Sequence, residues 1–449
     1  MRDKRGISAG DTLRAIGFLP LCNPRAGLGT GFEYLRLLRS QWWSRDEIEK
    51  YQGEKLEHLV DQAVATVPHY SGLGLQKKPT GLGAREFLTS WPILTKEDIR
   101  ACPERTHSNS ASRGLIFKAT TGGTTGDPIE VWKNQGALAV CEAALWRGKA
   151  WLEIKPWDRG IHAYGFGGGS WYGKLRVRMT RKWGVEAFNT SEETRKAFID
   201  LLRRTRPVYI EGFITDLLRL GEVQECSRYG IRQVITTAEM LYEGQRERLE
   251  KYYGARVSDY YGSNEVNSIA FECEEGTKHV TDEHVILETV DDAGRPVWDA
   301  PGRILVTDLD NHAMPLIRYA LGDTGVLTSK PCACGRKLAV LKTLLGRTQD
   351  ALRNESGEKL SAVFFAGKFK EIKKIRRFQL IQKSLREVEL AYEMAEPGVE
   401  PELAAIVSEI KNRLGPQMAV RVQQVENLPR TEVGKCRLVA GLPEEKPLG

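Results

Sequence analysis

The chain has no long uninterrupted run of apolar residues. Near the N-terminus, the stretch from Ala15 to Cys22 is weakly apolar, but Pro20 interrupts it and no small-residue cleavage site follows. The mean hydropathy is −0.38, which is typical of a chain that folds around its own core in water. We therefore expect a protein of the cytoplasm that does not insert into a membrane.

Cysteine is sparse and scattered, with eight residues spread over 449 positions. Disulfide frameworks are typical of short secreted chains, so this distribution argues against one. By contrast, the close pair Cys332-Ala333-Cys334 has a spacing that suggests metal or redox chemistry. Four other cysteines have no partner at a meaningful spacing and are expected to be ordinary thiols, namely Cys22, Cys141, Cys226 and Cys436.

A large excess of one charge is also missing, since 66 basic residues face 59 acidic ones. The densest basic run, residues 368–377, is expected to be a solvated helix face and not a nucleic-acid surface. The formal charge of +7 suits a protein that handles polyphosphate substrates. With 449 residues, 41% of them apolar, and no internal repeat, the chain is long enough for two unequal domains.

The first half of the chain changes its periodicity once. Residues 45–67 carry apolar side chains at helical spacing until Pro68 ends the pattern, which predicts an N-terminal helical region. From Leu115 to Val306, short apolar runs alternate with longer amphipathic segments. Alternation of this kind predicts an α/β domain.

The second half changes character twice more. Closely spaced strands with turns between residues 285 and 327 predict a β-rich subdomain. Beyond Gly346, mixed strands and helices predict a small α+β domain of about a hundred residues. We therefore place the domain boundary between residues 1–346 and 347–449.

A glycine- and threonine-rich segment, Thr120 to Pro128 (TTGGTTGDP), is the strongest local motif. Glycines let the backbone approach a ligand closely, and hydroxyl and N–H groups can surround phosphate oxygens. The segment lacks the Lys-Ser/Thr ending of a Walker loop. Taken alone, it is either a phosphate-binding loop or a surface turn.

Four further segments follow this loop along the chain. They are Asp259–Glu265 (DYYGSNE), Arg318–Asp323 (RYALGD), Leu345–Arg347 (LGR) and Leu428–Lys435 (LPRTEVGK). Together with the loop, and in this order, they resemble the motifs of the adenylate-forming enzyme superfamily. The resemblance covers nearly the whole chain and implies a large multi-layer α/β N-terminal domain with a small mobile C-terminal domain.

Finer features resemble one family within that superfamily, the phenylacetate–coenzyme A ligases. They are Trp91–Asp98 (WPILTKED), Tyr164–Gly169 (YGFGGG) and the pair Ala238-Glu239. Residues 378–382 (FQLIQ) are more similar to a subgroup of capsular-polysaccharide biosynthesis. The resemblance implies ATP, magnesium and a carboxylic acid as ligands, with coenzyme A or an amine as acceptor.

Chemical type and resemblance agree on the roles of these residues. ATP cleavage between the α and β phosphates needs hydrogen-bond donors, a divalent cation and a carboxylate that holds it. Glu265 suits that carboxylate, Asp323 suits the ribose hydroxyls, and either Tyr260 or Tyr261 can stack on adenine. Glu265, Thr124 and Lys435 are the expected catalytic residues. The expected nucleotide-binding residues are Thr120, Thr121, Gly122, Gly123, Thr124, Thr125, Gly126, Ala238, Glu239, Asp259, Tyr260, Tyr261, Gly262, Glu265, Asp323 and Arg347.

Three positions depart from the family pattern. Asp127 stands where a lysine is common, so the loop has to rely on N–H groups and threonine hydroxyls. The usual hinge aspartate is replaced by Gln349, followed by Asp350, so the pivot is one of these two. The turn Asn354–Gly357 stands where coenzyme A ligases often have glycine-valine-asparagine, which weakens the case for coenzyme A.

A second metal site is suggested by Cys273 and His279 together with Cys332 and Cys334. Three thiolates and one imidazole suit tetrahedral Zn²⁺, and a complete protein shell leaves no open position, which indicates a structural role. His284 is a rival for the histidine position. Surface thiols with an unrelated histidine are the alternative.

The acyl pocket and the acceptor remain open from the sequence. Aromatic residues follow the phosphate loop and suit an aromatic or hydrophobic acid, although core packing explains them equally well. They are Trp132, Trp146, Trp151, Tyr164, Phe166, Trp171 and Tyr172. The alternatives to acyl transfer onto coenzyme A are amide formation with a saccharide or amino-acid amine, and a non-catalytic protein that retains the ligase scaffold.

Overall fold

The computed structural model describes most of the chain. The described residues are 9–74, 83–110, 115–120, 129–163, 171–185, 192–222, 226–241, 243–347, 352–356, 359–360, 374–394, 399–428 and 439–442. Among the described helices, none combines the length and the apolarity that a bilayer crossing requires.

The N-terminal region is helical, as its periodicity predicts. It begins with α1 (Ala9–Cys22) and α2 (Gly29–Ser40), and the long helix α3 (Arg45–Thr66) follows. Ser44 caps α3, because its side chain accepts from Glu47 N–H while the Glu47 carboxylate accepts from Ser44 N–H. The region ends with α4 (Pro68–Ser71), α5 (Ala84–Leu88), α6 (Lys96–Ala101) and η1 (Pro103–Thr106).

A mixed sheet of eleven strands forms the centre of the molecule. Its order is β10-β11-β12-β13-β9-β8-β7-β6-β5-β3-β4. The strands are β3 (Gly160–Ala163), β4 (Lys182–Gly184), β5 (Tyr209–Phe213), β6 (Gln233–Thr237), β7 (Arg256–Ser263), β8 (Asn267–Glu272), β9 (Lys278–Val280), β10 (Val285–Val290), β11 (Gly302–Asp308), β12 (Tyr319–Thr328) and β13 (Val340–Arg347). Strands β3 to β7 pair in parallel, whereas the other pairs are antiparallel.

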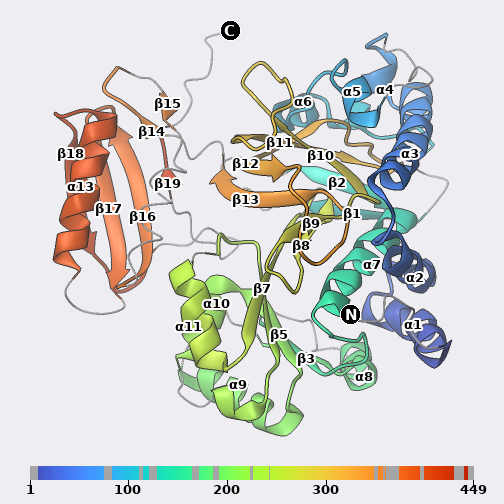
Figure 1. The fold of residues 1–449 in the computed structure, drawn as a ribbon, viewed down its shortest axis with the longest axis horizontal. Coiled ribbons are helices and arrows are strands. Elements are labelled where there is room, and N and C mark those ends of the chain that lie inside the picture. Colours follow the sequence, from blue (N-terminus) through green and yellow to red (C-terminus); the bar gives the residue numbers. More distant parts are fainter. Residues whose placement is uncertain are drawn as a thin grey trace.

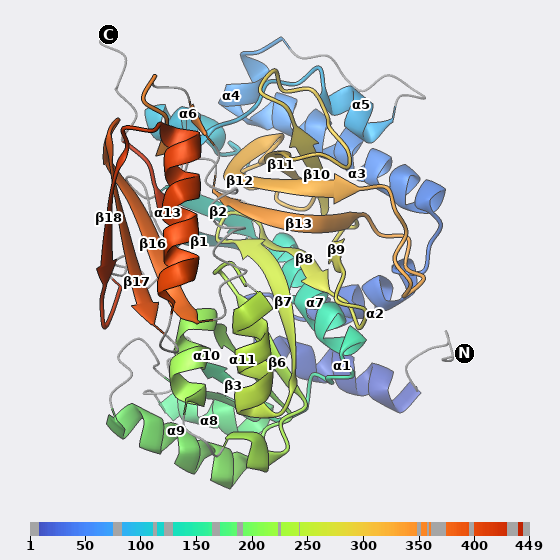
Figure 2. The ribbon, with the colours of Figure 1, turned by 60° about the vertical axis from the view of Figure 1, so that its left-hand side comes forward.

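Helices cover both faces of the parallel part of this sheet (Figures 1 and 2). One face packs under α9 (Glu192–Thr205), α10 (Ile214–Gly221) and α11 (Glu243–Tyr253), around an apolar core that includes Phe198, Leu217 and Val257. The other face packs against α7 (Gln135–Trp151), with α1 and α2 outside it. Helix α7 lies very close to β8, because a Cβ at Gly148 would be 2.3 Å from the ring of Phe271.

Smaller elements complete the described parts of the chain. A separate hairpin consists of β1 (Ile116–Thr120) and β2 (Glu130–Asn134), and its two strands flank the predicted phosphate loop. Helix α8 (Trp171–Thr180) follows β3, and the short helix η3 (Cys226–Tyr229) precedes β6.

The C-terminal part has its own sheet and its own core. Four strands have the order β18-β17-β16-β19, and α13 (Glu400–Leu414) packs on them around Leu380, Leu390 and Ile406. The strands are β16 (Ile375–Ser384), β17 (Glu387–Met394), β18 (Ala419–Gln424) and β19 (Val439–Ala440), preceded by the hairpin β14 (Leu352–Arg353) and β15 (Lys359–Leu360). In Figure 1 this part lies to one side of the eleven-stranded sheet. The expected fold class, a large α/β part followed by a smaller α+β part, is confirmed.

Candidate functional site

Two of the predicted motifs meet at a hydrogen bond between Tyr261 and Asp323. Tyr261 lies near the end of β7, Asp323 lies within β12, and the Tyr261 hydroxyl donates to the Asp323 carboxylate over 2.6 Å. Asp323 also pairs in register with Arg347, the last residue of β13. Three of the expected nucleotide-binding residues, Tyr261, Asp323 and Arg347, therefore lie together on the sheet.

The start of the phosphate loop lies beside the same segment. The side-chain amide of Asn264 donates to the carbonyl of Thr120, the last residue of β1, over 3.1 Å. The other expected loop residues, Thr121 to Gly126 and with them the catalytic candidate Thr124, lie outside the described residues. Their hairpin nevertheless brings the ends of the loop next to the segment that carries Glu265.

Glu265 is buried and bears a negative charge. Its carboxylate lies 3.0 Å from the ammonium of Lys96, the first residue of α6, and accepts from the Tyr319 hydroxyl over 3.2 Å. Burial favours the neutral acid, but the interaction with Lys96 outweighs it and lowers the pKa of Glu265 below its usual value. Lys96 and Tyr319 were not among the residues that the sequence suggested, although both belong to the motifs that carried the resemblance.

Gly262 has a steric reason to be glycine. A Cβ at this position would be 2.3 Å from the carbonyl oxygen of Asn267, on the neighbouring strand β8. The pairing of the two strands is irregular between Tyr261 and Gly262. Close approach of the backbones turns the chain sharply at the segment that holds Glu265.

The expected adenine edge begins at the end of β6. Thr237 pairs with Tyr260 in the parallel register, and Ala238 follows it with φ of +65°, in the left-handed region that alanine rarely adopts. Strain of this kind is concentrated at functional sites. Ala238 therefore has the backbone conformation and the neighbours expected of a residue beside a ligand.

The two tyrosines of the motif have different surroundings. Tyr260 stacks on Phe271 with ring centroids 5.7 Å apart and packs against the core beneath α7. Only Tyr261 of the two contacts Asp323 among the described residues, and it is therefore the better candidate for adenine stacking. The carboxylate of Asp259 is bound by the Thr236 hydroxyl at 2.7 Å and the Lys278 ammonium at 3.0 Å.

The expected zinc ligands come together from two distant parts of the chain. Cys273 and His279 flank the turn between β8 and β9, and Cys332 and Cys334 lie between β12 and β13. The ligand atoms of all four lie within 4.8 Å of one another. Cys273 Sγ is 3.8 Å from Cys332 Sγ, and Cys334 Sγ is 3.2 Å from His279 Nε2.

This geometry fits a tetrahedral zinc ion. Two sulfurs bound to one tetrahedral Zn²⁺ at about 2.3 Å lie about 3.8 Å apart. The hydrogen bond from the Cys273 thiol outweighs burial and lowers the pKa of Cys334, and the same bond raises the pKa of Cys273. Without a metal ion, this pair of sulfurs therefore holds one thiolate, on Cys334, and one thiol. Leu338 O lies 3.4 Å from His279 Nδ1 and can orient the ring.

The rival ligand His284 belongs to a different cluster. Its Nδ1 is 2.8 Å from a carboxylate oxygen of Asp310, and its Nε2 is 3.2 Å from the sulfur of Cys141. Cys141, which was expected to be an ordinary thiol, thus has a specific partner. Of the two histidines that the sequence offered, His279 is the one whose ring lies with the three cysteines.

Of the expected aromatic residues after the phosphate loop, the four described tryptophans have different surroundings and do not share one pocket. Trp146 and Trp151, which both lie on α7, are buried in the core. Core packing therefore explains these two residues, as the alternative interpretation of the sequence proposed. Trp132 stacks on His107 with centroids 4.0 Å apart, and Trp171 is exposed. Tyr164 and Phe166 lie outside the described residues, as does the Tyr172 side chain.

Several expected residues of the C-terminal part also lie outside the described residues. They are Lys435 and the hinge candidates Gln349 and Asp350. The segment that leads to Lys435 is anchored, because Leu428 N–H donates to the buried Glu393 carboxylate over 2.7 Å.

Comparison with known proteins agrees with these motifs. Residues 352–441 match the family described as the CapK C-terminal domain. The chain is 26% identical over 454 residues to a phenylacetate–coenzyme A ligase of Thermus thermophilus, covering 89% of this chain and 97% of that protein. It is 28% identical over 334 residues to a phenylacetate–coenzyme A ligase of Aromatoleum evansii, covering 69% and 72% of the two chains.

Solved structures share the fold. A 2-hydroxyisobutyryl-CoA ligase in the postadenylation state superposes with a TM-score of 0.71 at 19% identity, covering 90% of this chain and 92% of that one. The amide bond synthetase McbA from Marinactinospora thermotolerans superposes with a TM-score of 0.50 at 18% identity, covering 72% and 66%. The resemblance inferred from the motifs is confirmed by these relatives.

Proposed function

We propose that this chain, an AMP-forming acid ligase by the relatives it resembles, converts a carboxylic acid into an acyl-AMP and then transfers the acyl group to coenzyme A. In the first step a carboxylate oxygen attacks the α-phosphorus of ATP and pyrophosphate leaves. In the second step the coenzyme A thiol attacks the acyl carbon, loses its proton, and AMP leaves. The observation that best supports this proposal is the 2.6 Å hydrogen bond between Tyr261 and Asp323.

The residues around this hydrogen bond have the chemistry that a bound nucleotide needs. The Asp323 carboxylate can accept from two ribose hydroxyls while it holds the Tyr261 hydroxyl. The Tyr261 ring is then fixed for stacking against adenine. Arg347, paired with Asp323 across the strands, suits the ribose or the α-phosphate.

Glu265 is our candidate for the magnesium ligand. Magnesium prefers carboxylate oxygens, and Glu265 is both ionised and buried beside the phosphate-loop hairpin. Bound magnesium would neutralise negative charge on the phosphates. Lys96, which is 3.0 Å from Glu265, would keep the carboxylate oriented before nucleotide binds.

The acid is best sought by ATP–pyrophosphate exchange, which reports the first step without any acceptor. We expect exchange with at least one acid from a panel that begins with aromatic and hydrophobic carboxylates. Asp323→Ala serves as the matched inactive variant, because it removes the ribose acceptor. If a normally folded protein shows no exchange with any acid of the panel, the non-catalytic scaffold is favoured.

Amide formation is the second candidate, and one observation favours it. The match to the CapK C-terminal domain covers residues 352–441, which include the expected catalytic-lysine loop. Within it, the side-chain oxygen of Asn354, just after β14, accepts from both the N–H and the hydroxyl of Ser356. The two candidates differ in product, so mass spectrometry after supplying coenzyme A and a set of amines separates them.

We also propose that Cys273, His279, Cys332 and Cys334 hold a structural zinc ion. The support is the soft donor set and its tetrahedral spacing. Zinc there would pin the turn between β8 and β9 to the segment between β12 and β13. Asp323 lies on β12, and Glu265 lies in the turn that leads into β8.

A further inference from the structure

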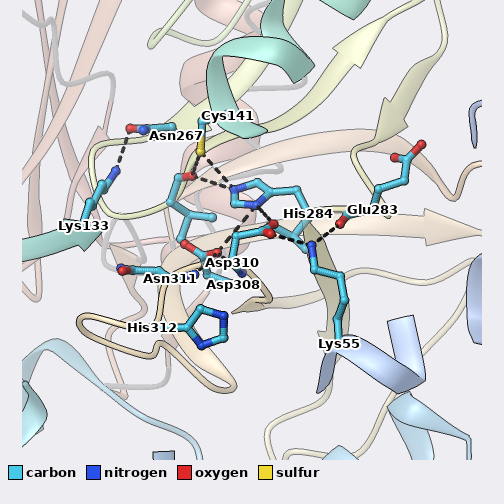
Figure 3. Close-up of polar contacts among 12 residues, drawn as sticks. Lys55, Lys133, Cys141, Asn267, Glu283, His284, Asp308, Asp310, Asn311 and His312 are labelled. Atoms are coloured by element: carbon cyan, nitrogen blue, oxygen red, sulfur yellow. Dashed lines mark hydrogen bonds and ion pairs between the residues drawn. The ribbon is translucent and has the colours of Figure 1, made fainter. Parts of the chain in front are cut away.

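A buried cluster of charged side chains lies behind the segment that carries Glu265 (Figure 3). At its centre is His284, which is fully buried just before β10. His284 Nδ1 lies 2.8 Å from Asp310 Oδ2, and His284 Nε2 lies 3.2 Å from the carbonyl oxygen of Val266. The ring therefore bridges an acidic loop and the residue that follows Glu265.

Both nitrogens of the His284 ring face acceptors. A carbonyl oxygen and an ionised carboxylate can only accept hydrogen bonds. Both nitrogens of the His284 ring must therefore carry a hydrogen atom. Burial opposes the charge on Asp310, but hydrogen bonds from His284 and the ammonium of Lys55, 2.6 Å away, lower its pKa to about 2. His284 is thus a buried imidazolium between Asp310 and the more distant Asp308, whose oxygen is 3.6 Å from Nδ1.

The same loop is tied to the strand that follows the phosphate loop. Asp308 accepts from the N–H groups of Asp310 and Asn311. The side-chain amide of Asn311 donates to the carbonyl of Trp132, on β2, over 2.9 Å. The loop between β11 and β12 is therefore fixed to the phosphate-loop hairpin.

A second tether reaches the Glu265 segment from β2 itself. The buried ammonium of Lys133 donates to the side-chain oxygen of Asn267 over 2.7 Å. Asn267 has φ of +68°, so this interaction helps to hold an unfavourable backbone conformation. Three side chains thus hold residues 266 and 267. His284 and the Cys141 thiol, which donates over 3.4 Å, contact the carbonyl of Val266, and Lys133 contacts the side chain of Asn267.

We propose that His284 is a positioning residue that fixes the backbone carbonyl of Val266 and thereby aims the Glu265 carboxylate at the nucleotide site. The proposal rests on the proposed function, because it assigns Glu265 to magnesium. It assigns no direct contact with substrate to His284. Its action passes through one hydrogen bond from Nε2 to the main chain.

The cluster does not suit a metal ion, although His284, Asp308 and Asp310 have ligand atoms within 4.8 Å of one another. A metal would need an unprotonated Nδ1, whereas this nitrogen faces a carboxylate at hydrogen-bond distance. The Lys55 ammonium also contacts Asp310 at 2.6 Å. Two carboxylates are balanced by one imidazolium and one ammonium, so no further positive charge is required.

Two conservative substitutions separate the two nitrogens of His284. The amide nitrogen of glutamine lies near the place of Nε2, so His284→Gln can keep the donor to Val266. The amide of asparagine lies near the place of Nδ1, so His284→Asn can keep the contact with Asp310 and loses the donor to Val266. His312→Gln is the matched control, since His312 lies in the same loop and bonds Gln62.

The first readout needs no activity. Hydrogen–deuterium exchange of the unliganded protein should rise in peptides that span residues 263–268 for His284→Asn, and stay near wild type for His284→Gln and His312→Gln. Lys133→Met, which removes the second tether, should raise exchange in the same peptides. Unchanged exchange in His284→Asn would overturn the proposal, whatever the enzyme catalyses, and a rise in Lys133→Met would then show that the peptides do respond to a lost tether.

The second readout is the magnesium concentration for half-maximal ATP–pyrophosphate exchange. We expect it to rise about tenfold in His284→Asn, because partners that orient metal ligands typically contribute 10–100-fold to metal affinity. A change below about twofold is expected for His284→Gln. A larger rise in His284→Gln than in His284→Asn would show that His284 acts only through Asp310, and this result would overturn the proposal. Absence of exchange in the wild-type protein would reject the proposed function and leave the first readout decisive.

Discussion

At the scale of single residues, the pairing of Tyr261 with Asp323 gives the most direct prediction. Tyr261→Phe removes the hydroxyl that donates to Asp323 over 2.6 Å and keeps the ring for stacking. Loss of a hydrogen bond to a charged group costs about 1.5–3 kcal/mol, so the KM for ATP should rise about tenfold or more, with kcat less affected. Both constants are measured by steady-state kinetics with an acid that supports ATP–pyrophosphate exchange. The buried Tyr253→Phe, whose hydroxyl bonds Leu217 O on the far face of the sheet, is the control.

His284 gives a prediction about stability and pH. Burial lowers its pKa, but Cys141, Asp308 and Asp310 outweigh burial and raise the pKa well above the usual 6.5. A raised pKa in the folded state means that the stabilisation is fully present below about pH 6.5, and is lost as the pH rises through the folded-state value. Above pH 6.5, the free energy of unfolding of the wild type should therefore fall with pH more steeply than that of His284→Gln. Urea unfolding between pH 6 and pH 9 measures this, and parallel curves for the two proteins would contradict it.

At the scale of secondary structure elements, the four proposed zinc ligands lie in two separate connections between strands. Cys273 and His279 border the turn from β8 to β9, and Cys332 and Cys334 lie between β12 and β13. Metal bound there couples its binding energy to folding. We expect about one zinc per chain in metal-replete protein, by the stoichiometry of a closed four-ligand site.

Substitution of two ligands tests this connection. Cys332→Ser together with Cys334→Ser should remove the zinc and lower the melting temperature, because the two turns are no longer held together. Elemental analysis and thermal unfolding measure both effects. Cys226→Ser is the control, since this cysteine is buried in the core beneath α9 to α11 and is remote in the chain from the four ligands. Zinc retained in the double variant would rule out the assignment.

At the scale of the whole molecule, the C-terminal part touches the rest of the protein at identifiable places. Met240, just beyond the expected adenine edge, packs against the C-terminal core. Arg219, on α10, donates to the side chain of Asn427 over 2.8 Å, close to the loop of Lys435.

Lys435 gives the prediction at this scale. An ammonium between the attacking carboxylate and the departing pyrophosphate stabilises the transition state more than the ground state. Lys435→Ala should therefore lower ATP–pyrophosphate exchange by roughly 10²–10³-fold, the effect of losing one preorganised charge. Acyl transfer from supplied acyl-adenylate should persist, because the rotation that we propose about residues 347–350 would remove this loop for the second step. Exchange near the wild-type rate would refute both the lysine's role and the domain rotation. Lys411→Ala, on the exposed face of α13, is the control.

The sequence by itself determined the elements and the order of the motifs. Helix α3 follows from its periodicity, its Ser44–Glu47 cap and Pro68, and the strands β5 and β6 follow from short apolar runs. These features depend on neighbours in the chain, so local physics decides them. The sequence also singled out Cys273, His279, Cys332 and Cys334 as a group, because these residue types are rare and are typical of metal sites, and the four lie together in the structure.

Tertiary structure alone decided which side chains share the site. The ion pair of Lys96 with Glu265, the choice of His279 over His284, and the difference between Tyr260 and Tyr261 each depend on strands distant in the chain lying side by side. Periodicity places a side chain on a face of its own element and carries no information about the partner across it. The role of His284 was hidden for the same reason, since its charge is set by Asp308 and Asp310, which only the folded chain brings to its ring.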